Sequence, residues 1–261
     1  MRLVQYVVDA FTDRVFAGNP AAVVLAEADL SETLMRSIAA ENNLSETAFV
    51  RADADGWRLR WFTPTVEVPL CGHATLATAA TLADRGHSGP FRFETASGRL
   101  TVTVEDGLFT LDFPAWAVAP AEAPEGLAAA LGAAPLEVHR GRDWICVFAS
   151  PAEVEALTPD HGRIAALAGE RVIATAAGGE GVDVTSRYFA AKVGVPEDPV
   201  TGVAHTQLVP FWAARLGRTA LLCRQASRRG GLLRCELVGD RVRLGGRAAI
   251  FSRGEIEVAE V

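Results

Sequence analysis

The sequence has no excess of basic residues, since 32 acidic side chains outnumber 25 basic ones and give a formal net charge of −7. Proteins that bind nucleic acid need such an excess to neutralise phosphates, so this partner class is excluded. No stretch approaches 18 uninterrupted apolar residues, and we therefore expect no membrane-spanning helix and no membrane partner. The 261 residues are enough for one large domain or two of about half that length.

Cysteine is scarce, and the sequence lacks the common metal and nucleotide motifs. Cys71, Cys146, Cys223 and Cys235 form no CxxC pair, and the N-terminus begins like a strand rather than an export signal. We expect reduced thiols and a cytoplasmic location. The histidines show neither HxxxH nor HExxH spacing, and Cys71-x-His73 alone cannot complete a zinc site. With neither GxxxxGK[ST] nor GxGxxG present, the sequence predicts no metal and no cofactor.

One motif occurs twice. The first copy spans Phe62–Thr75 (FTPTVEVPLCGHAT), and the second spans Phe189–His205 (FAAKVGVPEDPVTGVAH). A Phe, two Val and a Pro recur at a constant offset of 127 residues, and each copy leads into a glycine-containing helix start. The repeat predicts an internal duplication with pseudo-two-fold symmetry, in which a small molecule binds between the two halves.

Each half contains one helix that is apolar on all sides. Residues 72–83 are mostly Ala, Thr and Leu without a charge, and Ala204–Leu216 is a second mostly apolar segment. Helices of this kind are buried. A further helix of about ten residues is expected after its N-cap Ser31, with Leu34 and Ile38 on the buried face.

Many short alternating segments with Gly-containing turns predict strands around the two buried helices. The fold class predicted is α+β, with two pseudo-symmetric lobes, each a strand-rich half-barrel around a buried helix. The stretch 114–126, rich in Ala, Pro and Glu, marks the boundary, so the lobes span residues 1–115 and 116–261. The sequence leaves open whether the last strand returns to the first lobe.

The two predicted helix starts are candidate anion sites. Backbone N–H groups at Gly72 and Gly202 lie at the positive ends of buried helices, and glycine permits close approach of a ligand. Two such ends facing one cleft would clamp a carboxylate or stabilise an enolate. A helix start without a ligand is the alternative. His73, in the first turn, is expected to be biased toward its neutral form by the helix dipole.

For two acidic residues, Asp198 and Glu46, the local sequence pattern does not decide between a functional and a structural role. Asp198 lies at the matching turn of the second half, where an Asp-Pro turn is also a common structural feature or a helix cap. Glu46 lies between a helix and an apolar strand, where a lone Glu is commonly a solvated edge residue. The pattern alone does not single Glu46 out.

Four motifs together resemble the PhzF-like (phenazine biosynthesis) isomerase family. They are DAFTDRVFAGNPAAVV from Asp9, NLSETAF from Asn43, CGHAT from Cys71 and EDPVTG from Glu197. The resemblance spans residues 7–216 and implies the diaminopimelate-epimerase-like fold, often in homodimers. It also implies cofactor-independent proton transfer on a small carboxylate-bearing substrate.

Site residues carry over motif by motif from this resemblance. Glu46 matches the family's catalytic acid/base, and His73 and Asp198 match residues that bind and protonate the substrate. Gly72 and Gly202 match the backbone donors. The next residue, Val203, departs from the Ser often found there, which removes a hydroxyl contact and favours a less polar ligand.

Two alternatives remain open at this stage. A thiol-based racemase or epimerase would use Cys71 as a base at the helix start, but the matching turn of the second half has no cysteine. A non-catalytic binding or regulatory protein of the same fold would have kept the residues and lost the chemistry.

Overall fold

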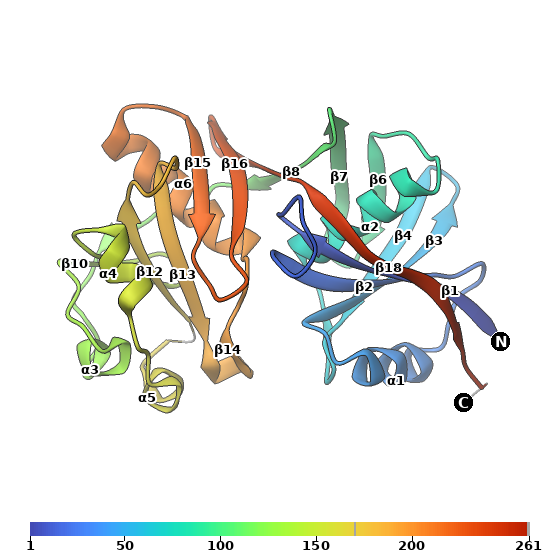
Figure 1. Ribbon diagram of the computed structural model, residues 1–261, viewed down its shortest axis with the longest axis horizontal. Helices are drawn as coiled ribbons and strands as arrows, with labels where there is room; N and C mark the ends of the chain where they lie inside the picture. Colours follow the sequence, from blue (N-terminus) through green and yellow to red (C-terminus); the bar gives the residue numbers. More distant parts are fainter. Residues whose placement is uncertain (170, 260–261) are drawn as a thin grey trace. The chain divides into compact units, whose positions relative to one another are not determined.

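The computed structural model describes residues 1–169 and 171–259, and the chain divides into two units (Figure 1). The first unit comprises Met1–Asp112 and Gly245–Val261, and the second comprises Phe113–Leu244. No helix in the described residues is long and apolar enough to span a membrane.

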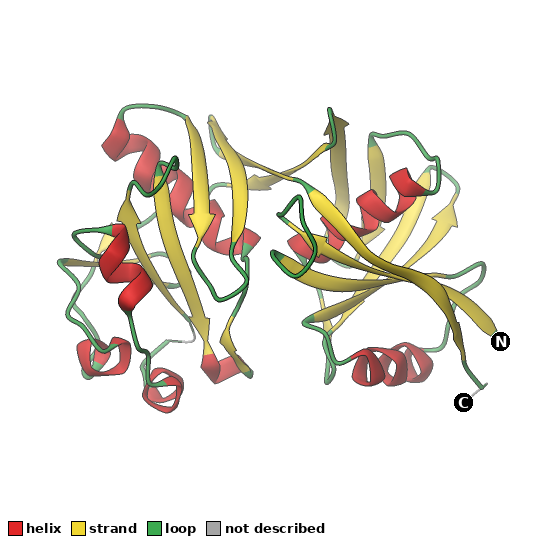
Figure 2. Cartoon of the chain, viewed as in Figure 1, coloured by secondary structure: helices red, strands yellow, loops and turns green. Residues whose placement is uncertain are grey.

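The first unit contains two helices and a curved sheet (Figure 2). Its helices are α1 (Glu32–Asn42) and α2 (Gly72–Asp84). Its strands are β1 (Arg2–Ala10), β2 (Asn19–Leu25), β3 (Glu46–Asp53), β4 (Gly56–Phe62), β5 (Glu67–Val68), β6 (Phe91–Thr95), β7 (Gly98–Glu105), β8 (Leu108–Pro114) and β18 (Ala248–Glu257).

In its described residues the second unit contains four α-helices, one 3₁₀ turn and nine strands. Its helices are α3 (Leu127–Leu131), α4 (Pro151–Ala156), α5 (His161–Ala166) and α6 (Gly202–Leu216), with the 3₁₀ turn η1 at Ala191–Val193. Its strands are β9 (Ala119–Pro120), β10 (Glu137–Arg140), β11 (Trp144–Val147), β12 (Val172–Ala177), β13 (Val184–Ala190), β14 (Val195–Glu197), β15 (Ala220–Gln225), β16 (Gly231–Val238) and β17 (Arg241–Gly246).

The strand pairings repeat between the units. The first unit pairs in the order β18-β1-β2-β3-β4-β6-β7, and only β2–β3 and β4–β6 are parallel. The second unit pairs in the order β9-β10-β11-β12-β13-β15-β16, and only β11–β12 and β13–β15 are parallel. The short strands β5 and β14, which carry the repeated motif, pair with β4 and β13. The duplication inferred from sequence is therefore a duplication of topology.

The repeat also explains where the chain changes unit. β9 follows β8 along the chain but pairs with β10, and β18 follows β17 but pairs with β1 along its whole length. Each half therefore gives its last strand to the other. The sequence left open whether the last strand of the second lobe, residues 116–261, returns to the first lobe, and the structure places Gly245 and the described residues after it in the first unit.

Helix α2 is buried along nearly its whole length and packs against β1, β2 and β3. Its apolar sequence is interrupted by three threonines, whose hydroxyls donate to backbone carbonyls four residues earlier. These bonds run from Thr75, Thr78 and Thr81 at 2.6, 2.7 and 2.9 Å. Because each hydroxyl has a partner on the helix backbone, the three threonines can be buried without unsatisfied hydroxyl groups.

Helix α6 tolerates a proline for a similar reason. Pro210 has no N–H to donate, so the carbonyl of Thr206 loses its partner within the helix. That carbonyl instead accepts the backbone N–H of Trp116 at 3.0 Å. The compensation keeps α6 continuous through its buried length.

Helix α1 follows the sequence prediction closely. The Ser31 hydroxyl caps it by accepting the Leu34 N–H at 3.2 Å, and Leu34, Met35 and Ile38 are buried. They form a core cluster with Phe49 and other apolar side chains of the sheet. Helix α1 thus covers one face of the β3–β4 hairpin.

His205 in α6 should control acid stability. Its Nδ1 lies 2.8 Å from the Thr201 carbonyl, and burial lowers the pKa of His205 to about 4 from an ordinary 6.5. Below pH 6.5 the unfolded chain therefore binds a proton that the folded chain does not. As the pH falls from 6.5 to 4, this imidazole should therefore lower the free energy of unfolding by up to about 3 kcal/mol.

Urea unfolding of wild type and His205→Asn across this pH range measures the effect. We expect a shallower acid limb in the variant, whatever its stability at pH 7. The exposed His87→Gln is the control and should keep the wild-type slope. Equal slopes for wild type and His205→Asn would contradict the assignment.

Candidate active site

A tight turn places Asn19 in the interior of the first unit. Gly18 has a φ of 64°, and a Cβ there would lie 2.1 Å from the Ala10 carbonyl oxygen, so only glycine fits. The Asp9 carboxylate fixes the same turn by accepting the Phe16 N–H at 2.9 Å. The chain then enters β2 with the Asn19 side chain fully buried.

Glu46 begins β3, next to the start of the buried helix. Asn43 ends α1 in the left-handed conformation that Asn tolerates, and β3 then pairs parallel to β2 with Glu46 opposite Ala21. Ala48 and Val50, which share a face with Glu46 by strand alternation, are buried. Glu46 thus points toward α2 and keeps 19% of its side chain exposed.

His73 joins these elements into one cluster. Its Nε2 lies 3.2 Å from Glu46 Oε2, and its side chain is only 8% exposed. On the other side of the ring, Nδ1 lies 3.3 Å from Asn19 Nδ2 and 3.5 Å from Cys71 Sγ. The structure therefore brings together Glu46 and His73, both expected from sequence, with Asn19 and Cys71.

The Glu46–His73 contact leaves room for a ligand. Although the two atoms are 3.2 Å apart and both are buried, neither Glu46 Oε2 nor His73 Nε2 has a partner in hydrogen-bonding geometry among residues 1–169 and 171–259. Buried polar atoms without partners are rare in folded proteins and are costly. Their presence side by side is typical of a site completed by a bound molecule.

The charge of His73 differs from the sequence prediction. Burial by itself lowers the pKa of His73, but the neighbouring Cys71 and Glu46 together raise that pKa well above its ordinary value. The expected bias toward neutral imidazole is therefore wrong. A helix dipole presents about half a charge, and a carboxylate at 3.2 Å presents a full negative charge that outweighs it.

Cys71 is the N-cap of α2 and is buried. Burial and the Glu46 carboxylate raise the pKa of the Cys71 thiol, so the sulfur is protonated at neutral pH. A reactive cysteine needs the opposite shift. The thiol therefore belongs to the surroundings of the imidazole rather than acting as a base.

Glu46, Cys71 and His73 are also the one group of potential metal ligands among residues 1–169 and 171–259, with ligand atoms within 4.8 Å of one another. Their arrangement does not fit a single ion. Glu46 approaches Nε2 of the imidazole whereas Cys71 approaches Nδ1, and one imidazole presents only one nitrogen to an ion at about 2 Å. The three groups form a chain across the ring instead.

Asp198 lies before the start of α6 in the second unit and is held by a polar network. Its carboxylate accepts the hydroxyl of Thr201, and its backbone carbonyl accepts the Gln225 amide at 2.7 Å. Gln225 also accepts the Thr201 N–H at 2.9 Å and is fully buried. Thr201 rather than Asp198 is the N-cap of α6, so the capping role considered for Asp198 is wrong.

The two duplicated helices start without side-chain caps. The N-cap side chains of α2 and α6, Cys71 and Thr201, accept no helix N–H, whereas side chains cap α1, α4 and α5. The first amides of α2 and α6, from Gly72 and Gly202 onward, therefore donate to neither N-cap side chain. Val203 follows Gly202 as the second helical residue and is half-buried.

Sequence reasoning missed Asn19 and Gln225. Both are fully buried polar residues, and each touches a residue that the motifs did identify. For Asn19 a signal existed, because it lies inside the motif DAFTDRVFAGNPAAVV, one of the four that carry the family resemblance. No sequence pattern marks Gln225, whose position depends on the pairing of β13 with β15.

Comparison with known proteins assigns the family. The chain matches the model of the phenazine biosynthesis-like protein family, PhzC-PhzF, over residues 8–254. The chain belongs to this family. It is 46% identical to an uncharacterised isomerase of Pseudomonas aeruginosa, over 99% of this chain and 100% of that protein. The PhzF-family member is therefore an isomerase, as the sequence predicted.

Solved structures confirm the fold. A PhzF-family crystal structure from Enterococcus faecalis is 44% identical, with a TM-score of 0.96 over 99% of this chain and 100% of that one. A predicted epimerase from Pseudomonas aeruginosa shares the fold at 19% identity, with a TM-score of 0.74 over 98% of this chain and 100% of that one. The predicted epimerase-like α+β fold is confirmed.

Replacing Glu46 should lower the pKa of His73. In Glu46→Gln the imidazole loses the carboxylate while its burial stays, so its charged form is destabilised. NMR titration of the His73 ring resonances measures this, with the exposed Glu41→Gln as the control. An unchanged His73 titration in Glu46→Gln would show that the carboxylate does not set this charge.

Proposed function

We propose that this PhzF-family isomerase moves a proton on a small carboxylate-bearing substrate without a cofactor, with Glu46 as the acid/base. The observation that carries the proposal is the buried Glu46–His73 pair at 3.2 Å, whose facing atoms have no hydrogen-bond partner. A base held in such a place, with water largely excluded, is what abstraction of a C–H proton requires.

Glu46 and His73 together can accept the proton removed from the substrate and return one to it. Glu46 takes a proton from a carbon next to an activating group, and the C–H electrons pass into an enolate or enol. His73 lies within proton-transfer reach of Glu46, and its raised pKa keeps a proton on the ring. The proton returned to the substrate can come from either group, and the substrate ends as an isomer with no change in its atoms.

Backbone amides supply the complementary charge. The uncapped start of α2 at Gly72 presents N–H groups beside His73, which suits a substrate carboxylate or a developing enolate. In the second unit we assign substrate binding to Gly202 and Val203, and substrate binding and protonation to Asp198. Val203 presents an apolar side chain where a hydroxyl is common in the family, which favours a less polar substrate group.

The alternatives from sequence are weaker than this proposal. A thiol-based racemase would need an acidic Cys71, yet burial and Glu46 raise the pKa of that thiol. A non-catalytic binding protein is disfavoured by relatives that are named isomerases over nearly their full length. The cytoplasmic location and the homodimer stay proposals; the cysteines of the described residues are all free thiols.

Solvent exchange tests the catalytic role. The wild-type protein is incubated in D₂O with a set of small carboxylates and amino acids, and deuterium gain is read by mass spectrometry. We expect label in at least one compound, reduced at least about 100-fold in Glu46→Gln and unchanged in the exposed Glu41→Gln. Label persisting at the wild-type rate in Glu46→Gln would remove Glu46 from the mechanism.

A substitution at Gly202 tests close approach of the ligand without disturbing the fold. A Cβ at this position would meet the Leu244 Cδ1 atom at 3.6 Å, an ordinary contact, so the fold does not require glycine here. Gly202→Ala should keep or raise stability by up to about 1 kcal/mol, because alanine is the better helix former. The same change should lower turnover by at least about tenfold by blocking close approach of the substrate.

Thermal unfolding and the exchange assay check the two halves of this prediction on one sample. Val203→Ser is the matched neighbour, which keeps the backbone and restores a hydroxyl. Full activity in Gly202→Ala would mean that no ligand approaches this backbone closely.

A further inference from the structure

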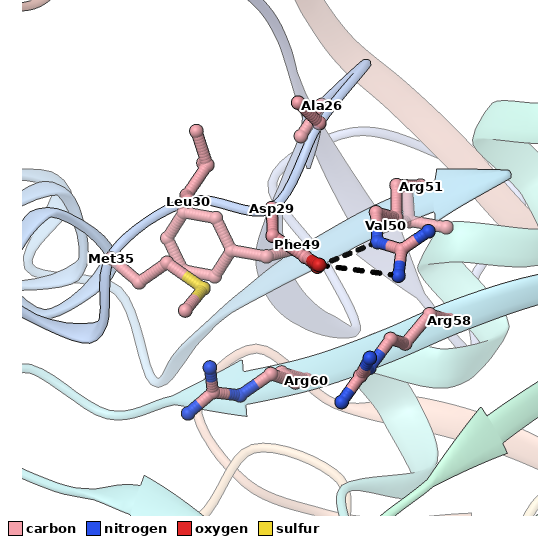
Figure 3. A pocket seen from close by; sticks show the side chains of 10 residues that line it. Ala26, Asp29, Leu30, Met35, Phe49, Val50, Arg51, Arg58 and Arg60 are labelled. Carbon is pink, nitrogen blue, oxygen red and sulfur yellow. Dashed lines mark hydrogen bonds and ion pairs between the residues drawn. The ribbon is translucent and has the colours of Figure 1, made fainter.

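The β3–β4 hairpin carries a second polar region on the face opposite Glu46. Strand alternation places Phe49 and Arg51 of β3 on one face, directly across from Arg60 and Arg58 of β4. Helix α1 covers the Phe49 end through Met35. The pair formed by Arg51 and Arg58 lies further along the hairpin, next to the loop that precedes α1 (Figure 3).

A hollow of about 150 Å³ lies at this place. Its apolar wall includes Leu30, Met35 and Phe49, and its polar wall is formed by one carboxylate, Asp29, and three arginines, Arg51, Arg58 and Arg60 (Figure 3). An apolar wall combined with guanidinium groups is complementary to an organic anion.

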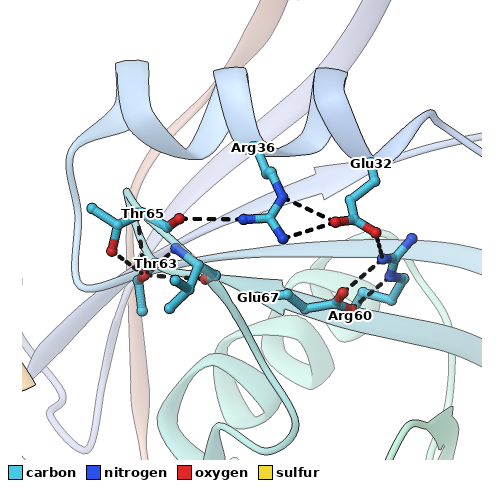
Figure 4. Close-up of polar contacts among 7 residues, drawn as sticks. Glu32, Arg36, Arg60, Thr63, Thr65 and Glu67 are labelled. Atoms are coloured by element: carbon cyan, nitrogen blue, oxygen red, sulfur yellow. Dashed lines mark hydrogen bonds and ion pairs between the residues drawn. The ribbon is translucent and has the colours of Figure 1, made fainter.

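Two of these arginines already have carboxylate partners. Arg51 pairs with Asp29 at 2.7 Å. Arg60 donates from Nε and Nη2 to the two carboxylate oxygens of Glu67, each at 2.7 Å. A second contact joins Arg60 to Glu32 at 3.4 Å, and Glu32 is itself held by Arg36 (Figure 4). The network fixes the Arg60 guanidinium in the wall of the hollow.

Arg58 is different. Within residues 1–169 and 171–259 no carboxylate forms an ion pair with it, although it lies directly across the ladder from Arg51. Like charges at directly opposed positions destabilise a strand pair unless a counter-charge is present. Arg58 is thus an exposed cation without a carboxylate partner in the described part of the chain, and it lines a partly apolar hollow.

We propose that this hollow is a binding site for a small organic carboxylate, with Arg58 as its anchor. A planar guanidinium binds a carboxylate through two parallel hydrogen bonds. The apolar part of the ligand packs against Phe49 and Met35. The volume is well below the ~300–1,000 Å³ of sites for drug-sized ligands, so the occupant has few heavy atoms beyond its carboxylate.

This site is separate from the Glu46–His73 cluster. Arg51 and Glu46 lie on opposite faces of β3, and the five residue steps between them correspond to about 16 Å along the strand. Binding at Arg58 therefore does not depend on the proposed catalytic chemistry.

The experiment uses benzoate as the probe in ¹H–¹⁵N NMR titrations of the full chain. Benzoate should shift the amides of residues 49–60, and Arg58→Gln should weaken that binding at least about tenfold. Arg228→Gln, which changes an exposed arginine of the second unit, should leave it unchanged. Benzamide, with the same ring and no charge, should bind at least about tenfold more weakly than benzoate.

The proposal is wrong if benzoate shifts no amide of residues 49–60, or if it binds Arg58→Gln as tightly as wild type. It is also wrong if inorganic phosphate binds as tightly as benzoate, because the apolar wall would then contribute nothing to binding. Shifts confined to residues 46 and 71–74 would also overturn it, since they would place the probe at the proposed catalytic cluster. Repeating the titration in Glu46→Gln keeps the two sites distinguishable, because binding at Arg58 should survive that change.

Discussion

The 3.2 Å contact between the Glu46 carboxylate and the His73 imidazole is the interaction on which the active-site argument depends. It exists because α2 is buried, so that its first turn meets the start of β3 in the interior of the first unit. Burial destabilises the charged form of each side chain by removing water, and the opposite charge of the partner offsets part of this cost. The two groups are therefore coupled: without Glu46, burial lowers the pKa of His73 and favours its neutral form.

Duplication gave the chain two equivalent helix starts that have since become different. The first carries titratable groups, with His73 between Glu46 and Cys71. The second carries neutral polar groups that fix one acid, with Gln225 and Thr201 bound to Asp198. The two helix starts therefore no longer present the same chemical groups.

Much of this architecture could be predicted from sequence because its signals are local. The repeated motif predicts the repeated topology, Ser31 predicts a capped helix, and the charge-free run after Gly72 predicts the buried helix. The exchange of final strands could not be predicted, because β18 could pair equally well with either half by its own pattern. The raised pKa of His73 could not be predicted either, since it arises from Cys71 together with Glu46, and Glu46 is distant along the chain. Glu46 was identified only through family resemblance, for the same reason.

The helices differ in whether the side chain of the N-cap residue accepts a hydrogen bond from the first turn. Ser31, Ser150 and Asp160 each accept a helix amide, and such a cap is worth about 1 kcal/mol. Thr201 is a suitable capping residue at the start of α6, yet its hydroxyl donates to Asp198 and leaves the helix amides uncapped. The same oxygen accepts the Gln225 amide at 3.1 Å, so both of its hydrogen-bonding roles are taken outside the helix. The contact with Thr201 orients the Asp198 carboxylate, and the uncapped start of α6 is what the proposed anionic substrate would require.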